Sequence, residues 1–203
     1  MPTQTGYEAA CSVEERGRAI ILPFLKSRSH DGQLVVFNKG ALMRHVQERI
    51  GDFAFNSDAD RFYTVEMKVE QTHTGNLFLE TWSNKNLENR QSHFERGSNP
   101  GWMLKSTAEL LFYYFLDNDH LYIIDLLELQ RWAFGVDEAQ PQMLRPQYRE
   151  VRQGRYHQRN DTWGRLVPIY DIRNALTERH FKLVYPKQIE MFEAADETGL
   201  PEV

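Results

Sequence analysis

Charged and apolar side chains alternate along residues 61–70, RFYTVEMKVE. Because successive side chains of a β-strand point to opposite faces, Glu66 and Lys68 share one face and Met67 lies on the other. Asp52 stands upstream, at the start of another short segment with strand-like alternation. An antiparallel pairing of the two segments would bring two carboxylates and one ammonium together. Such a set can bind a divalent cation and activate a water for phosphodiester hydrolysis.

Residues 50–55 and 61–70 are predicted to form this hairpin around a polar turn. Asp58 and Asp60 compete with Asp52 for the place of the first carboxylate. They lie in the predicted turn, however, where Asp is favoured because its side chain can hydrogen-bond to nearby backbone. The alternative is that the charged face of residues 61–70 is simply the solvated side of an open sheet.

The rest of the chain alternates between helix and strand patterns. Residues 12–15, SVEE, form a capping box that predicts a helix with Ser12 as N-cap, running through residues 20–21 and kinked or ended at Pro23. Further elements are predicted as a strand at 34–37, a helix at 41–49, a strand at 77–82, a loop at 83–100, a buried helix opened by a capping box at 106–109 and carrying the apolar run 110–116, a strand at 120–124, a helix at 126–134, strand-like segments near 148–157 and 165–170, and a helix at 171–179. This order predicts an α/β domain with a central mixed sheet flanked by helices.

Length and composition limit the possible classes of protein. A chain of 203 residues has room for one substantial domain. No stretch approaches the roughly 20 apolar residues of a membrane span, so a cytoplasmic protein without a membrane partner is expected. Cys11 is the only cysteine, which excludes an intramolecular disulfide and a cysteine-rich zinc site.

Charge is unevenly distributed along the chain, whose formal net charge is −5. Residues 189–203 contain acidic side chains and no Lys or Arg, whereas residues 145–165 are rich in arginine. We therefore divide the chain into a core at 1–140, an Arg-rich extension packed on it at 141–188, and an acidic tail at 189–203.

Nucleic-acid contacts are expected from basic side chains around the predicted hairpin and in the extension. The candidates are Lys85, Arg90, His93, Arg96, Lys105, Arg149, Arg152, Arg155 and Arg159. A solvated basic strand is the alternative for the arginines. Trp82 and Trp102 can stack on bases, and the alternative for both is packing in the core or at its rim.

Three segments resemble a known family. They are Gly51-Asp52, then VEMKVEQTHTGNLFLETWSN at 65–84, then GWMLKSTAELLFYYF at 101–115. Together they are similar to the PD-(D/E)xK, or restriction-endonuclease-like, nuclease superfamily, and within it to a largely uncharacterised branch of phage and mobile-element proteins. The shared features are an E-x-K strand, a T-G-N turn, an L-x-(I/L)-E strand and a helix starting at G-(W/I). The match covers residues 50–134, and Gly51 stands where the superfamily motif has proline.

The resemblance implies a restriction-endonuclease-like core and a metal-dependent nuclease that cleaves DNA in the cytoplasm of a bacterial host cell, with RNA not excluded as substrate. Asp52, Glu66 and the Met67 carbonyl would bind one Mg²⁺ or Mn²⁺. Lys68 would orient or deprotonate the attacking water, or stabilise charge in the transition state. Burial and the nearby metal are expected to lower the pKa of Lys68.

Two further acids are possible auxiliary residues by the same resemblance. Glu80, on the adjoining strand with Asn76, would assist a second metal or bind a metal-bound water, and a structural role is the alternative. Glu15 would reach the cleft from the first helix, and its place in the capping box is the alternative.

Two other classes of function remain open from the sequence. One is a catalytically silent nucleic-acid-binding or inhibitory protein on the same fold. The other is a dimeric interaction protein, in which residues 110–116 and 126–134 form the partner interface and the acidic tail is a regulatory or DNA-mimicking segment.

Overall fold

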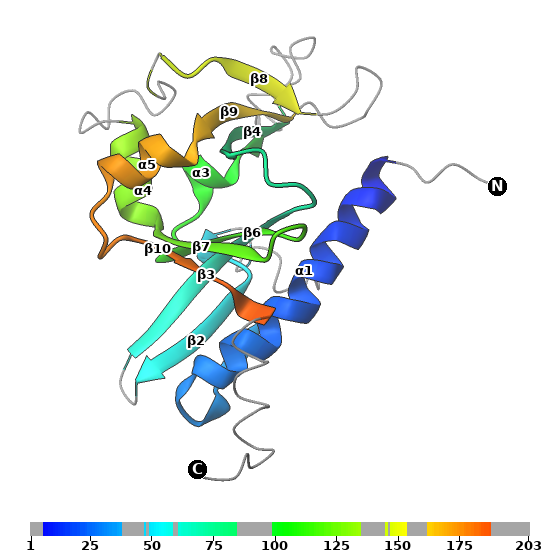
Figure 1. Ribbon diagram of the computed structural model, residues 1–203, viewed down its shortest axis with the longest axis vertical. Helices are drawn as coiled ribbons and strands as arrows, with labels where there is room; N and C mark the ends of the chain where they lie inside the picture. The colour runs from blue at the N-terminus through cyan, green and yellow to red at the C-terminus, as the bar shows by residue number, and fades with distance from the viewer. Residues whose placement is uncertain are drawn as a thin grey trace, which may run out of the picture.

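The computed structural model describes residues 6–37, 47, 49–58, 61–84, 99–134, 145, 147–153 and 162–187, which form two β-sheets with flanking helices (Figure 1). The larger sheet has six strands, in the order β1 (Leu34–Val36), β2 (Phe53–Asp58), β3 (Arg61–Glu70), β6 (Leu110–Phe115), β7 (His120–Asp125) and β10 (Phe181–Val184). The smaller sheet has four antiparallel strands, in the order β5 (Asn99–Pro100), β4 (Asn76–Asn84), β9 (Thr162–Pro168) and β8 (Glu150–Gln153). The helices are α1 (Gly6–Arg28), α3 (Trp102–Lys105), α4 (Leu126–Phe134) and α5 (Ile169–Ala175), with a 3₁₀ turn, η1 (His30–Gly32). These ranges therefore have a mixed α/β architecture, and none of their helices is long and apolar enough to cross a membrane.

The predicted hairpin is present as β2 and β3. The two strands pair antiparallel from Phe53 opposite Val65 to Asp58 opposite Arg61. Asp58 therefore lies at the turn, at the far end of the hairpin from Glu66. The apolar alternation of β2 and β3 specifies this register because a shift by one residue would turn the apolar side chains to the wrong face.

Strand β6 is the largest departure from the predicted secondary structure. Residues 110–116 are predicted as helix, but Leu110–Phe115 form a strand parallel to β3 and antiparallel to β7. A strand with apolar layers on both faces is a continuous apolar run, and periodicity alone cannot distinguish it from a buried helix. Its aromatic residues favour the strand. Because residues 111–116 are buried inside the chain, they are not available as a partner interface.

Helix α1 also differs from its prediction. It begins at Gly6 in the described part of the chain, so Ser12 lies inside the helix and is not its N-cap. Pro23 does not end it, and the helix continues to Arg28. An internal proline costs a helix about 3 kcal/mol or more. Here the apolar side chains on both sides of it, Ile21 and Phe24, are buried against the sheet, and this burial offsets the cost.

The smaller sheet places β4 away from the hairpin. Strand β4 confirms the strand predicted at 77–82, yet it pairs with β9 and β5, not with β3. Strand β7 and helix α4 also confirm their predictions, whereas α5 begins and ends earlier than the helix predicted at 171–179. Strand β10, which pairs with β7, was not predicted. The predicted helix at 41–49, the loop at 83–100 and the acidic tail at 189–203 lie wholly or mostly outside the described residues.

Two apolar clusters lie on opposite faces of the larger sheet. One contains residues of α1, β2, β3, β6 and β7, and the other joins β6 and β7 to β4, α3, α4, β9 and α5. Met67 belongs to the cluster on the α1 side. Because side chains alternate along β3, Glu66 and Lys68 face the other side, toward α3 and the smaller sheet. The site therefore forms where the two layers meet.

Candidate active site

Asp52 is held against β3 by backbone contacts at the start of β2. Its N–H donates to the Val65 carbonyl at 2.6 Å, and its Oδ2 accepts a hydrogen bond from the Met67 N–H at 2.9 Å. Gly51 makes this approach possible, since it has a φ of +113° and a Cβ there would lie 2.4 Å from the Val65 oxygen.

Glu66 and Lys68 form an ion pair on the opposite face of β3 from Met67. The Lys68 Nζ lies 2.6 Å from Glu66 Oε1, and the Ser106 hydroxyl donates to Glu66 Oε2 at 3.1 Å. Lys68 also lies over the Trp102 ring, with Nζ 5.7 Å from the ring centroid. Glu66 is only 8% exposed, so both of its oxygens have partners away from bulk water.

The carboxylates around Lys68 raise its pKa, and the lowering expected from a nearby metal stays a prediction. Burial by itself lowers this pKa. The negative charges of Glu66, Asp52 and Glu80, together with the hydrogen bond to Glu66, outweigh burial and hold the ammonium protonated well above its ordinary range. With these partners Lys68 is a cation at neutral pH.

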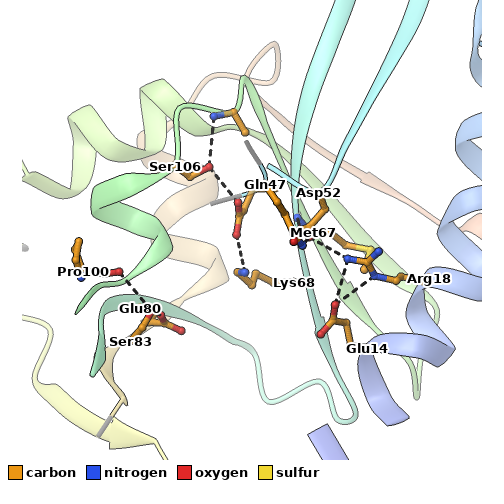
Figure 2. A network of polar contacts seen from close by, with 12 residues as sticks. Glu14, Arg18, Gln47, Asp52, Met67, Lys68, Glu80, Ser83, Pro100 and Ser106 are labelled. Carbon is orange, nitrogen blue, oxygen red and sulfur yellow. Dashed lines mark hydrogen bonds and ion pairs between the residues drawn. The ribbon is translucent and has the colours of Figure 1, made fainter. Parts of the chain in front are cut away.

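Helix α1 contributes a second ion pair to the site. Arg18 Nη2 lies 3.0 Å from Asp52 Oδ1 and 3.2 Å from Glu14 Oε1, one helical turn away. The Gln47 amide donates to the same Asp52 oxygen at 2.9 Å. Figure 2 shows Arg18 and Glu14 approaching Asp52 from α1, while Lys68 lies on the side of Ser106 and Glu80.

The structure brings Asp52, Glu66 and Lys68 together, as the sequence predicts. Glu80 lies close enough to raise the pKa of Lys68, and its carboxylate also accepts a hydrogen bond from Ser83. Glu15, in contrast, is exposed on α1, and its neighbour Glu14 carries the contact to Arg18. The prediction of Glu15 as an N-terminal capping residue is also wrong, because α1 begins earlier.

The sequence did not reveal Arg18, Gln47 or Ser106 as site residues. The spacing of Glu14 and Arg18, four residues apart in a helix, signals an ion pair but not its position next to Asp52. Ser106 was assigned to a capping box, but it follows α3 and its hydroxyl points to Glu66. The contacts of Arg18 with Asp52 and of Ser106 with Glu66 join distant parts of the chain, which local patterns do not report.

The expected nucleic-acid contacts are only partly described. Lys85, Arg90, His93, Arg96, Arg155 and Arg159 lie outside the described residues. Lys105 lies in the last turn of α3. Arg149 is exposed just before β8, and Arg152 is half-buried on that strand. Trp102 is 2% exposed, so it packs in the core and cannot stack on a base.

Other arginines of the basic segment make contacts within the protein. Arg145 donates to the Trp132 carbonyl at 2.7 Å and lies over the Trp132 ring. Arg165 donates to the Tyr148 carbonyl. These two guanidinium groups hold the segment before β8 against α4 and β9.

The oxygen atoms of the site suit a small divalent cation that takes only some of its ligands from the protein. Within the described ranges, no group of three or more His, Cys, Asp or Glu side chains converges as a metal site. Mg²⁺ is commonly held by one or two carboxylates, with waters and substrate phosphates completing its shell. Asp52 and Glu66 can supply the carboxylates. The Met67 carbonyl faces the same strand edge as its N–H, which contacts Asp52.

The charge balance points the same way. The carboxylates of the site exceed its two cationic groups, Arg18 and Lys68. These carboxylates belong to Glu14, Asp52, Glu66 and Glu80. Two of them, Asp52 and Glu66, are buried, where a negative charge is costly, and a divalent cation would reduce that cost.

No family model matches the chain, and neither the curated proteins nor the solved structures provide a match. The described residues define a mixed α/β protein with a carboxylate–lysine site on a β-hairpin. Function must therefore be argued from the geometry and charges of that site.

Proposed function

We propose that the protein is a metal-dependent nuclease that hydrolyses DNA phosphodiester bonds. The observation that carries this proposal is the convergence of Asp52, Glu66 and Lys68 on one hairpin, with Asp52 bonded to the backbone of Met67 between the other two. The resemblance of these residues to the PD-(D/E)xK motif supports the same reaction class.

Asp52, Glu66 and the Met67 carbonyl would hold Mg²⁺ or Mn²⁺. The bound cation would polarise the phosphate and lower the pKa of a water. Ser106 fixes the orientation of the Glu66 carboxylate through its hydroxyl. The fixed carboxylates spare the site the reorganisation that a mobile pair would require.

Lys68 would serve as a permanent positive charge in this reaction. Its ion pair with Glu66 and the carboxylates around it favour this role over that of a general base. As an ammonium it can stabilise the negative charge that develops on the phosphate oxygens, which is the role that fixed donors have in phosphoryl transfer. The Trp102 ring and Glu66 keep the ammonium in place.

A catalytically silent nucleic-acid-binding protein is the second candidate. It is favoured by one observation: the carboxylates of Asp52 and Glu66 are already bonded to donors of the protein itself. A silent site of this kind would be a structural ion network. Binding of DNA without metal-dependent cleavage would identify it.

The test is Mn²⁺-dependent cleavage of linear, single-stranded, branched and supercoiled DNA. We expect Lys68→Ala to reduce the rate by about 10²–10³-fold, as for loss of one transition-state donor, and Glu66→Gln to abolish detectable cleavage. Lys182→Ala, on exposed β10, is the matched control and should cleave like wild type. Circular dichroism confirms that each variant folds. No cleavage by wild type, or equal cleavage by all variants, would contradict the proposal.

A further inference from the structure

One oxygen of Asp52 accepts hydrogen bonds from two side chains. Oδ1 receives Arg18 Nη2 at 3.0 Å and Gln47 Nε2 at 2.9 Å, while Oδ2 receives the Met67 N–H. Of these donors, only Arg18 carries a charge. The guanidinium therefore neutralises the carboxylate that a divalent cation would need.

Arg18 has other partners that do not depend on Asp52. Its Nε donates to Glu14 Oε1 at 3.2 Å, and its guanidinium lies over the Phe53 ring, with Cζ 5.2 Å from the centroid. Its side chain is 19% exposed, so it lies at the edge of the protein and not deep within it. Arg18 can thus leave Asp52 while keeping its ion pair with Glu14.

The anchoring of α1 limits how far Arg18 can move. The preceding residue, Gly17, packs so closely on β3 that a Cβ there would lie 2.4 Å from Val69 Cγ2. The backbone of α1 is therefore packed closely on the sheet beside the site, so a change in the contact with Oδ1 would come from the Arg18 side chain.

We propose that Arg18 competes with the divalent cation for Asp52, so that Arg18 sets the cation affinity of the site. This inference rests on the proposed function, since it assumes that the cation uses Asp52. A cation that binds only after the guanidinium has left Oδ1 has its apparent affinity reduced by the fraction of molecules in the released state. Oδ1 already accepts hydrogen bonds from Arg18 and Gln47, and repulsion between the two cations opposes their binding at the same oxygen.

The first test is Mn²⁺ binding to the full chain, measured by isothermal titration calorimetry without DNA. Arg18→Gln and Arg18→Met remove the competing charge, and the methionine keeps an unbranched stem over Phe53. Both variants should bind Mn²⁺ about tenfold more tightly than wild type or better, as expected for loss of one charge-assisted hydrogen bond. Asp52→Asn should weaken binding.

Arg16→Gln is the matched control. Arg16 lies on the same helix and loses the same charge, but it donates to Gln71 at 2.9 Å and does not contact Asp52. Its Mn²⁺ affinity should equal that of wild type. Tighter binding by Arg16→Gln as well would overturn the inference, because it would trace the effect to net charge and not to the contact with Asp52.

A second readout uses the wild-type chain and does not depend on the folding of any variant. In a nitrogen-15 correlation spectrum, the Arg18 Hε–Nε signal should shift as Mg²⁺ saturates the site. An unshifted signal at saturation, or equal Mn²⁺ affinities of wild type and both Arg18 variants, would overturn the competition and leave the proposed function standing. Absence of binding in all three proteins would overturn both.

Discussion

Glu66 lies within β3 and Glu70 at its end, on the same face of the strand, but the two carboxylates have different partners. Glu66 pairs with the Lys68 ammonium and the Ser106 hydroxyl. Glu70 accepts a hydrogen bond from the neutral Tyr113 hydroxyl, whose oxygen also accepts the Phe78 N–H of the smaller sheet. Glu66 thus belongs to a cluster of charges. Glu70 and Tyr113 instead form a hydrogen-bonded joint between the two sheets.

The difference also affects protonation. Burial raises the pKa of Glu70, and the hydrogen bond from Tyr113 offsets only part of that effect. Burial and the neighbouring Glu70 likewise raise the pKa of Tyr113 well above its usual range. The alternation of β3 thus places each carboxylate on the polar face of the strand. Residues from other elements then determine whether that carboxylate is part of the candidate active site or of a structural contact.

The largest difference in cleavage rate is expected when Glu66 and Glu70 are each replaced by Gln. Glu66→Gln should abolish detectable Mn²⁺-dependent cleavage, since even indirect partners of a metal site are worth about 10–100-fold and Glu66 would bind the metal directly. Glu70→Gln should leave the cleavage rate close to that of wild type, because Glu70 does not contact Lys68 or Asp52. Rates measured on the same supercoiled DNA check both. Equal losses of cleavage rate in the two variants would show that Glu66 and Glu70 act as one site.

A smaller effect is expected on stability at the Glu70 end. Tyr113→Phe removes a buried hydroxyl and leaves the Phe78 N–H and Glu70 without it, so the free energy of unfolding should fall by about 1–3 kcal/mol. Urea denaturation measures the change. Tyr170→Phe is the control, because Tyr170 is 71% exposed and its loss of a hydroxyl should change stability little. An equal fall in the free energy of unfolding of both variants would contradict a stabilising role for the Tyr113 hydroxyl between the two sheets.

The smallest effect concerns the pH dependence of stability. The folded-state pKa of Glu70 lies above its unfolded value, so its stabilising contribution is complete below the unfolded pKa, near 4.5, and is lost as pH rises through the folded pKa. Wild type should therefore lose stability relative to Glu70→Gln over this rise. Urea midpoints of the two proteins at a series of pH values test the sign, with exposed Glu178→Gln as the control. If the urea midpoint of wild type instead fell relative to that of Glu70→Gln as the pH was lowered, the prediction would be contradicted.

The sequence predicted the part of the site that depends on local pattern. The alternation in residues 61–70 and the polar turn before them were enough to place Asp52 beside Glu66 and Lys68, because a hairpin is specified by neighbouring residues. Helix α4 and strand β7 were predicted for the same reason. These elements have clear periodicity and defined ends.

The remaining features depend on tertiary contacts. The apolar run of β6 has the same composition in a buried strand as in a buried helix, and only its position between β3 and β7 decides. The sequence did not show how many carboxylates surround Lys68, and these carboxylates raise its pKa. Arg18 and Ser106 reach the site from segments whose own patterns indicate only helix formation.

Because β3 and β6 are parallel, the chain must cross over between them, and residues 71–109 of this connection contain β4, β5 and α3. The hairpin of β2 and β3 closes over a short stretch of chain, whereas Trp102 and Ser106 come into place only after the whole crossover is in position. A chain emerging from the ribosome would thus display its paired acids and lysine to water first. The shell that gives them their partners would be added afterwards, when the nascent chain has passed β6.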